Sequence, residues 1–196
     1  CQSPETSLCY AVGQALELVG GFRSFIAPKS KVLVKPNLLM AIEPERAIDT
    51  HPEVVRAVIR YLKELQCTVM LGDGPSAWGN QIGNIARVYE RSGMKTIADE
   101  EAVQLVDFDK RRWRGAFPLT TRLDECDYFV SVPKFKTHQL TTLTCAIKNL
   151  FGLVASEYKP ELHRKFHDPE EFAKTLVDIL EQAKPVLTIV DAIDAL

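Results

Sequence analysis

Short hydrophobic runs alternate along this chain with longer segments of helical pattern. The runs are apolar throughout rather than at every second position, which is typical of strands covered on both faces. Alternating strands and helices predict an α/β fold, here a Rossmann-like three-layer sandwich with a mostly parallel sheet flanked by helices. We expect the first, second and fourth runs to be neighbours in the sheet. The five runs are residues 31–35, 67–71, 103–108, 128–132 and 186–190.

Several helix boundaries are legible in the sequence. Thr50-His51-Pro52-Glu53 has the spacing of a capping box. Asp168, followed by Pro169 and Glu171, is typical of an N-cap residue at the start of a helix. We expect further helical segments at residues 3–20, 80–93 and 141–152.

Length and charge limit the possible classes of protein. A chain of 196 residues suits a single α/β domain over 1–196, and because it does not begin with Met we expect a fragment lacking terminal segments of the full-length protein. A net charge of -2 argues against a general nucleic-acid or membrane surface, so any anion binding must be local. No apolar run reaches membrane-spanning length and no signal peptide is present, which favours a cytoplasmic protein.

The cysteines do not form a recognisable metal motif. There are five of them, widely spaced, without a Cys-x-x-Cys pair, so we expect no iron–sulfur cluster on this chain's own cysteines. Cys67 and Cys145 lie in apolar contexts, which suggests buried thiols in a reducing compartment.

Polar residues follow the predicted strands at the point where each strand ends. Because the carboxyl ends of parallel strands meet at one edge of a sheet, this arrangement predicts a ligand site there. Lys134, Lys136 and His138 alternate, and in an extended chain they would point to one side, which suits an anion site. The alternative is a basic loop that only keeps the edge of the sheet soluble. The residues concerned are Lys35 and Asn37 after the first strand, Asp73 after the second, Lys134, Lys136 and His138 after the fourth, and Asp191 after the fifth.

Two of these positions, and a pair of histidines further along the chain, have competing interpretations. A lysine at the end of a buried strand needs a partner, so Lys35 must meet either an acidic side chain such as Asp73 or a bound anion. Asp73, in the turn 72–76, can hold a cation or a hydroxyl, or can simply cap its own backbone. His163 and His167 have the spacing of metal ligands on one helical face, but they lie in a charged segment that a solvated face explains equally well.

The motifs at 32–39, 50–55, 72–76, 132–138, 146–152 and 189–193 together resemble the domain of unknown function 362 family. The resemblance is collinear over almost the whole chain. It implies an α/β domain and a preserved site that also involves His51, Lys148 and Asn149, without implying a known reaction. Some members are described as iron–sulfur proteins. This chain lacks their cysteine cluster, and also the Gly-rich acidic segment that normally follows the last strand.

These observations favour an enzyme domain that binds a small anionic substrate or cofactor, bearing a phosphate or a carboxylate, at the strand ends. The reaction type is open, and so are two alternatives: a redox protein that works with an iron–sulfur module absent from this chain, and a non-catalytic ligand-binding domain. A homo-oligomer is a further possible partnership. We assign His138, Lys136 and Asp73 to catalysis, Lys35, Asn37, Lys134, Lys148, Asn149 and His51 to substrate binding, and Asp73, Asp191 and His163 to a possible divalent metal ion.

Overall fold

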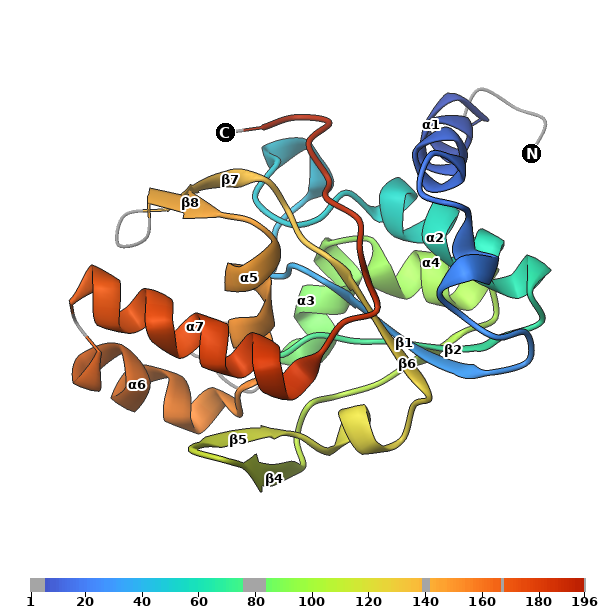
Figure 1. Cartoon of the computed structure of the whole chain (residues 1–196). Coiled ribbons are helices and arrows are strands. Elements are labelled where there is room, and N and C mark those ends of the chain that lie inside the picture. The colour runs from blue at the N-terminus through green and yellow to red at the C-terminus, as the bar shows by residue number, and fades with distance from the viewer. Residues whose placement is uncertain (1–5, 76–83, 139–141, 167, 196) are drawn as a thin grey trace.

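A five-stranded parallel sheet forms the centre of the molecule (Figure 1). The computed structural model describes residues 6–75, 84–138, 142–166 and 168–195. All five predicted strands are present, so the predicted α/β class is confirmed. In the order in which they lie in the sheet, the strands are β3 (Gln104–Leu105), β2 (Thr68–Leu71), β1 (Lys31–Pro36), β6 (Tyr128–Val132) and β9 (Leu187–Thr188).

The strand order creates a topological switch beside the central strand β1. One edge of β1 pairs with β2, with Val34 opposite Leu71, and the other edge pairs with β6, with Lys35 opposite Ser131. The predicted adjacency of these three strands is therefore confirmed. The chain first builds the sheet outward through β2 and β3, and then returns to the other side of β1 with β6 and β9. In such sheets the loops leaving the two strands at the switch diverge and open a crevice for a ligand.

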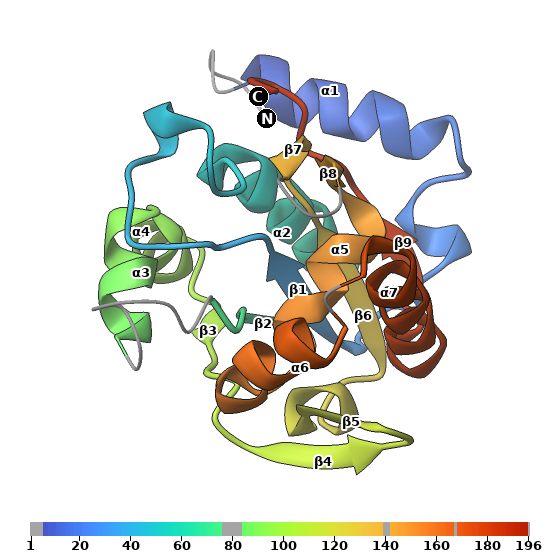
Figure 2. The same cartoon turned by 90° about the vertical axis from the view of Figure 1, so that its left-hand side faces the viewer.

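Helices cover both faces of the sheet, as Figure 2 shows. Alternate residues of β1 explain the three layers, because Val32 and Val34 belong to one buried hydrophobic cluster and Leu33 to the other. Each buried aliphatic side chain of this kind contributes about 1.5–3 kcal/mol. The first cluster packs against α1 (Thr6–Glu17), α2 (Pro52–Glu64), α3 (Ile85–Arg91) and α4 (Met94–Glu100). The second packs against α5 (Ala146–Asn149), α6 (Lys159–Lys165) and α7 (Pro169–Ala183).

Two helix starts differ in how closely they follow prediction. Asp168 caps α7 as expected, with its carboxylate accepting from the backbone N–H groups of Glu170 and Glu171. The cap of α2 is His51 rather than Thr50. The Thr50 hydroxyl instead accepts from the N–H of Asn37 and donates to the carbonyl of Val132, both at 2.8 Å. It therefore ties the loop after β1 to the end of β6.

The helix predicted at 141–152 is present only from Ala146, where α5 and the 3₁₀ turn Leu150–Leu153 follow one another. The chain instead forms an antiparallel pair of β7 (Lys136–His138) and β8 (Thr142–Thr144), and helical structure begins only with α5. β-branched threonines suit a strand better than the first turn of a helix, and this local preference decides the structure here. Short 3₁₀ turns follow at other points, at Phe22–Ser24, Pro44–Arg46, Thr121–Asp124, Leu150–Leu153 and Ser156–Tyr158.

Two further elements refine the prediction. The hairpin of β4 (Arg111–Arg114) and β5 (Phe117–Thr120) was not predicted, because its outer strand is mostly charged. The helix expected at 80–93 is present from Ile85, where Asn84 caps it, and the earlier part of that range lies outside the described residues.

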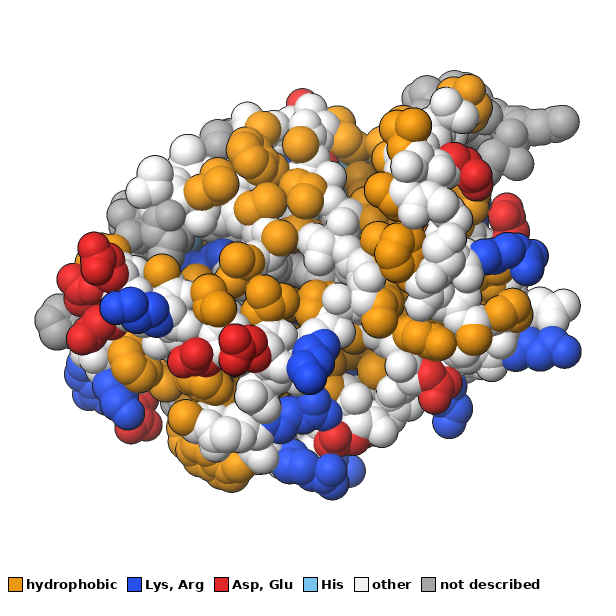
Figure 3. Space-filling view, viewed as in Figure 1, with side chains coloured by type: hydrophobic (Ala, Val, Ile, Leu, Met, Phe, Trp, Pro, Cys, Tyr) orange, Lys and Arg blue, Asp and Glu red, His pale blue; other side chains and the backbone are white. Residues whose placement is uncertain are grey.

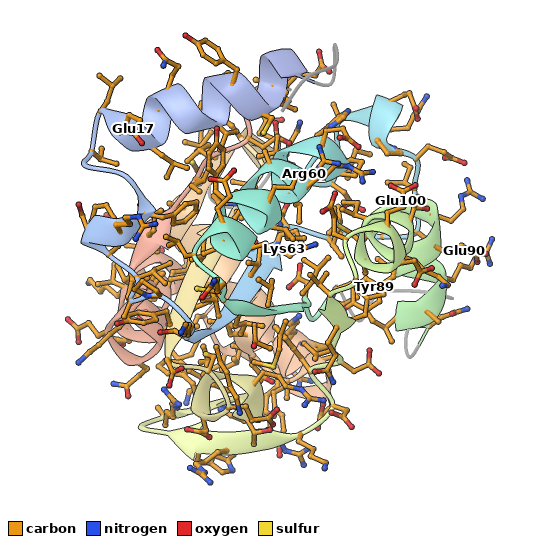
Figure 4. All side chains as sticks on the ribbon, turned by 90° about the vertical axis from the view of Figure 1, so that its right-hand side faces the viewer. Glu17, Arg60, Lys63, Tyr89, Glu90 and Glu100 are labelled. Carbon is orange, nitrogen blue, oxygen red and sulfur yellow. The ribbon has the colours of Figure 1, made fainter. Side chains whose placement is uncertain are left out.

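Ion pairs join α2 to the end of α4 on the outer surface, where Figure 4 labels Arg60, Lys63 and Glu100. Arg56 Nη1 lies 2.6 Å from Glu100 Oε2, and Arg60 Nε lies 2.7 Å from Glu101 Oε1. Individual exposed pairs contribute little, about 0–1 kcal/mol each. Together they connect the C-terminal end of α4 to α2.

Hydrophobic side chains remain exposed on the face in Figure 3, over the segment that leads to the C-terminus and over α7. Val190, Ile193 and Val177 are each more than 40% exposed. Scattered exposed apolar residues are normal on monomers, so they do not decide whether the protein is a homo-oligomer. No helix in the described part of the chain is long and apolar enough to cross a membrane.

Candidate functional site

A cavity of about 340 Å³ lies where the loops after β1 and β2 meet β7 and α5. It occupies the edge of the sheet that the sequence predicted as a ligand site. Six of the predicted site residues line it, namely Asn37, Asp73, Lys136, His138, Lys148 and Asn149. The remaining lining residues include Leu38, Leu39, Thr144, Phe151, Gly152 and Lys159.

A buried ion pair between Lys35 and Asp73 forms one wall of the cavity. Lys35 Nζ lies 2.7 Å from Asp73 Oδ1 and donates to Asn149 Oδ1 at 3.0 Å. Asp73 also accepts from the N–H groups of Leu38 and Gly74, each at 2.7 Å. Burial lowers the pKa of Lys35, and the charge of Asp73 opposes that shift. The partner that Lys35 requires is thus Asp73. Through these bonds the pair connects the loop after β1, the turn after β2 and the end of α5.

Tyr89 supports the same loop from α3 (Figure 4). Its hydroxyl donates to the carbonyl of Val106 at 2.8 Å and accepts from the N–H of Asp73 at 3.1 Å. Burial raises the pKa of Tyr89, so the phenol stays neutral and keeps both bonds. The backbone of the turn at Asp73 is therefore held by the Tyr89 hydroxyl as well as by the Asp73 side chain.

We expect Gly152→Ala to destabilise the protein by about 1–3 kcal/mol, as overpacking does in a filled site. An added Cβ would lie 2.5 Å from Asp73 Oδ1 and 2.6 Å from Lys35 Nζ, so the buried ion pair would have to move. Urea unfolding of the variant measures the loss. A Gly152→Ala variant as stable as wild type would contradict this packing.

Three lysines line the cavity, and two of them are held by backbone carbonyls. Lys136 Nζ donates to the carbonyl of Ile48 at 2.5 Å, and Lys159 Nζ donates to the carbonyls of Gly74 and Pro75. Burial lowers the pKa of Lys136 to about 8 and that of Lys159 to about 7. Both ammonium groups therefore sit where a negative charge would be strongly favoured.

The third lysine, Lys148, contacts aromatic rings. Its Nζ lies 5.0 Å from the ring centroid of Phe151 and 5.3 Å from that of Phe172. Within the described ranges, no carboxylate or carbonyl oxygen is within hydrogen-bond distance of this nitrogen. Burial lowers its pKa to about 8, with smaller contributions from Lys136 and Lys35. The described lining thus carries positive charge that its one acidic residue, already paired with Lys35, does not balance.

Two buried oxygen atoms beside the cavity have no hydrogen-bond donor in the described structure. They are Asn37 Oδ1 and Asp49 Oδ2. The other oxygen of Asp49 accepts from the N–H of Leu39 at 2.6 Å. Burial raises the pKa of Asp49 to about 7, and the nearby charge of Lys136 opposes the shift. An unsatisfied buried acceptor is costly, so Asn37 Oδ1, whose residue lines the cavity, is suited to a donor supplied by a ligand.

The structure places Lys134, Asp191 and His51 in a second cluster that does not line the cavity. Lys134 Nζ lies 3.0 Å from Asp191 Oδ2, and both side chains are fully buried. The same carboxylate oxygen accepts from the N–H of His51 at 2.7 Å. A Lys134→Ala change would therefore leave Asp191 buried without its counter-ion.

Two of the three proposed metal ligands, Asp73 and Asp191, are paired with lysines. Asp73 and Asp191 belong to separate lysine pairs. His163 lies on α6, but its side chain is outside the described part of the structure, as is His167. Among the described residues, no three His, Cys, Asp or Glu side chains group in a way that could hold a metal ion. Asp73 fits a metal poorly, because a cation there would oppose the Lys35 ammonium at 2.7 Å.

Sequence reasoning missed Lys159 and Asp49. Lys159 begins α6 in a strongly charged segment that looked like a solvated face, yet it is 4% exposed. Asp49 directly precedes the predicted helix start and looked like a loop residue, yet it is 3% exposed. No local pattern distinguishes either residue from its exposed counterparts, because both are buried by loops that come from elsewhere in the chain.

Fold and site together define a class of protein, namely a doubly wound α/β domain with a lysine-lined cavity beyond its central strands. More particularly, the chain belongs to the family known as domain of unknown function DUF362, whose model matches residues 32–196. The Thylakoid-associated protein sll1697 of Synechocystis sp. is 31% identical over 196 aligned residues. That alignment covers 96% of this chain and 60% of the relative, so the chain spans well under the relative's full length.

A solved structure shares the fold. The lactate racemase apoprotein from Thermoanaerobacterium thermosaccharolyticum superposes with a TM-score of 0.61 and 13% sequence identity. The match covers 93% of this chain and 48% of that one. At this identity the likeness establishes the α/β fold alone.

Proposed function

We propose that this chain is an enzyme domain that binds a small anionic substrate or cofactor, bearing a phosphate or a carboxylate, in the cavity at the strand carboxyl ends. The observation that carries the proposal is Lys148, a partly buried cation that meets ring faces and no anion in the described structure. Lys136 and Lys159 add positive charge to the same lining. A buried charge without a counter-ion is costly, and a bound anion removes that cost.

The lining residues suit different parts of such a ligand. Lys136 and Lys148 are placed to neutralise the anionic group, and Asn37 Oδ1 can accept from a ligand hydroxyl. His138 lines the cavity and is the best candidate for proton transfer, a role that imidazoles commonly fill. We assign Lys35, Asp73 and Asn149 to holding the wall rather than to chemistry, because their polar atoms are bonded to one another.

The structural neighbour is compatible with this proposal. Its name gives lactate, a small carboxylate, as the compound on which it acts. The shared fold therefore occurs in an enzyme whose substrate belongs to the proposed class. The part that matches this chain is 48% of that enzyme. We place the activity in the cytoplasm, which the buried free thiol of Cys67 favours, whereas the name of the Synechocystis relative refers to the thylakoid.

Titration calorimetry with inorganic phosphate and with succinate tests the proposal. We expect saturable binding that weakens above about pH 8, because Lys136 and Lys148, with pKa values of about 8, lose the charge that attracts the anion. An anion raises the pKa of a neighbouring ammonium, so binding near pH 8 should take up protons and its heat should depend on the buffer.

Two results would contradict the proposal. The first is the absence of saturable binding for phosphate, succinate and other small anions at low salt. The second is binding that is unchanged between pH 7 and pH 10, because a site that depends on these lysines must weaken as they deprotonate. Binding without any turnover of bound anions would instead favour the non-catalytic alternative.

A further inference from the structure

We propose that Lys148 is an amine nucleophile that forms an imine with the carbonyl carbon of a 2-oxo carboxylic acid. The inference rests on the proposed function, since the carboxylate of this substrate class is the anion that the cavity would hold. It assigns Lys148 a covalent role in place of charge neutralisation alone. The geometry that points to it is the contrast between Lys148 and the three other lysines at the cavity.

Those three lysines are engaged through their N–H groups, whose bonds hold each nitrogen in place as a donor. Lys35 is paired with Asp73, Lys136 donates to the carbonyl of Ile48, and Lys159 donates to two carbonyls of the turn after β2. Lys148 has no such acceptor in the part of the chain that the structure describes. Its nitrogen faces rings and the cavity, where nothing fixes it as a donor.

The surroundings of Lys148 favour the neutral amine that nucleophilic attack requires. Partial burial and the neighbouring charges of Lys35, Lys136 and Lys159 all disfavour a further ammonium there. A lysine desolvated beside another cation is a recognised way to activate an amine. The faces of Phe151 and Phe172 attract the cation and offset part of this effect. They also shield the nitrogen from water, which slows the hydrolysis of an imine.

The cavity accommodates both ends of a small 2-oxo acid. Its volume of about 340 Å³ is at the lower end of the range for small-molecule sites. Lys136 lines the same cavity and can hold the carboxylate while the carbonyl carbon meets Lys148. Lys136 then binds the carboxylate, and Lys148 reacts with the carbonyl carbon.

The reaction is a condensation that balances without a further reagent. The nitrogen lone pair of neutral Lys148 attacks the carbonyl carbon, and the carbonyl oxygen takes up a proton to give a carbinolamine. Loss of water, which carries away the oxygen and the two amine hydrogens, leaves the C=N bond. His138 lines the cavity and is placed to exchange the protons of these steps. The imine can then be protonated to an iminium ion.

Borohydride trapping tests the inference. The intact protein is incubated with pyruvate, and separately with 2-oxoglutarate, and is then treated with sodium borohydride, which reduces an imine to a stable secondary amine. Peptide mass spectrometry locates the adduct. We expect one reduced adduct on Lys148 in wild type and none in Lys148→Arg, which keeps the positive charge but cannot form this imine. Lys174→Arg, a change at an exposed lysine of α7, should leave the adduct on Lys148.

Phosphate titration of the same samples separates this inference from the proposed function. Phosphate binding without a Lys148 adduct from either oxo acid, or with adducts spread over exposed lysines such as Lys95 and Lys174, overturns the imine and leaves the anion site standing. Absence of both phosphate binding and adduct overturns both proposals.

A second measurement does not require the variant to fold. Brief reductive methylation of wild type with formaldehyde at pH 8 should modify Lys148 about tenfold faster or more than Lys174, because burial and the neighbouring cations lower the pKa of Lys148 to about 8. Equal or slower modification of Lys148 would overturn the inference.

Discussion

Lys35→Met is expected to lower the free energy of unfolding by about 3–5 kcal/mol, the usual cost of removing one partner from a buried ion pair. Both side chains of the Lys35–Asp73 pair are almost fully buried, and the change leaves Asp73 with a charge that the protein no longer balances. Met matches the lysine stem in length, so the loss of stability reports the removed charge and not a newly opened cavity. Urea unfolding followed by circular dichroism gives the value.

The matched control for this change is the double variant Lys35→Met/Asp73→Asn. Asn carries no charge and keeps one acceptor oxygen, enough for the N–H of either Leu38 or Gly74, so the double variant should recover part of the loss. Lys174→Met, on the exposed side of α7, should stay within about 0.5 kcal/mol of wild type. A Lys35→Met variant as stable as Lys174→Met would show that the ion pair does not hold the cavity wall.

Replacing Lys136 and Lys148 together with Met is expected to have the largest effect on anion binding. A charge-assisted contact contributes about 1.5–3 kcal/mol, so each change should weaken phosphate binding by about tenfold to a hundredfold. Because the two lysines share one cavity, the combined loss need not equal the sum of the single losses. Calorimetric titration at low salt measures it, since salt screens the attraction.

Lys174→Met is again the control, because it removes one positive charge without touching the cavity. Its phosphate affinity should equal that of wild type. Thermal melts of all variants separate lost binding from lost structure. Unchanged affinity in a folded Lys136→Met/Lys148→Met variant would place the anion, if one binds, somewhere other than this cavity.

Patterns within single segments were sufficient to predict the sheet and the edge of it at which the cavity lies. The continuous apolar runs identified the five strands, because strands covered on both faces leave no polar alternation. The rule that parallel strands end at a common edge then brought Asp73, Lys136 and His138 to one cavity, although they are far apart in sequence. Lys35 also reaches this edge, through its bond to Asp73.

What the sequence did not predict depends on tertiary contacts. Lys134 and Lys136 are equivalent in pattern, but one is paired with Asp191 beyond the end of β6 and the other lines the cavity. Lys159 became part of the site because α6 packs its first turn against the turn after β2. The β7–β8 pair replaced an expected helix because local strand preference outweighed the apolar spacing. The positions of Lys134 and Lys159 are thus set by partners that are distant in the chain, whereas the β7–β8 pair is set locally.

Direct location of a bound anion tests the central claim most sharply. Crystals of the protein soaked in selenate, an oxyanion with the shape and charge of sulfate, can be measured at the selenium absorption edge, where anomalous scattering marks each site. A strong peak inside the cavity, within contact distance of the Nζ atoms of Lys136 and Lys148, is the result we expect. Selenate peaks confined to the outer surface, with the cavity empty at a concentration that saturates binding in solution, would contradict the anion site.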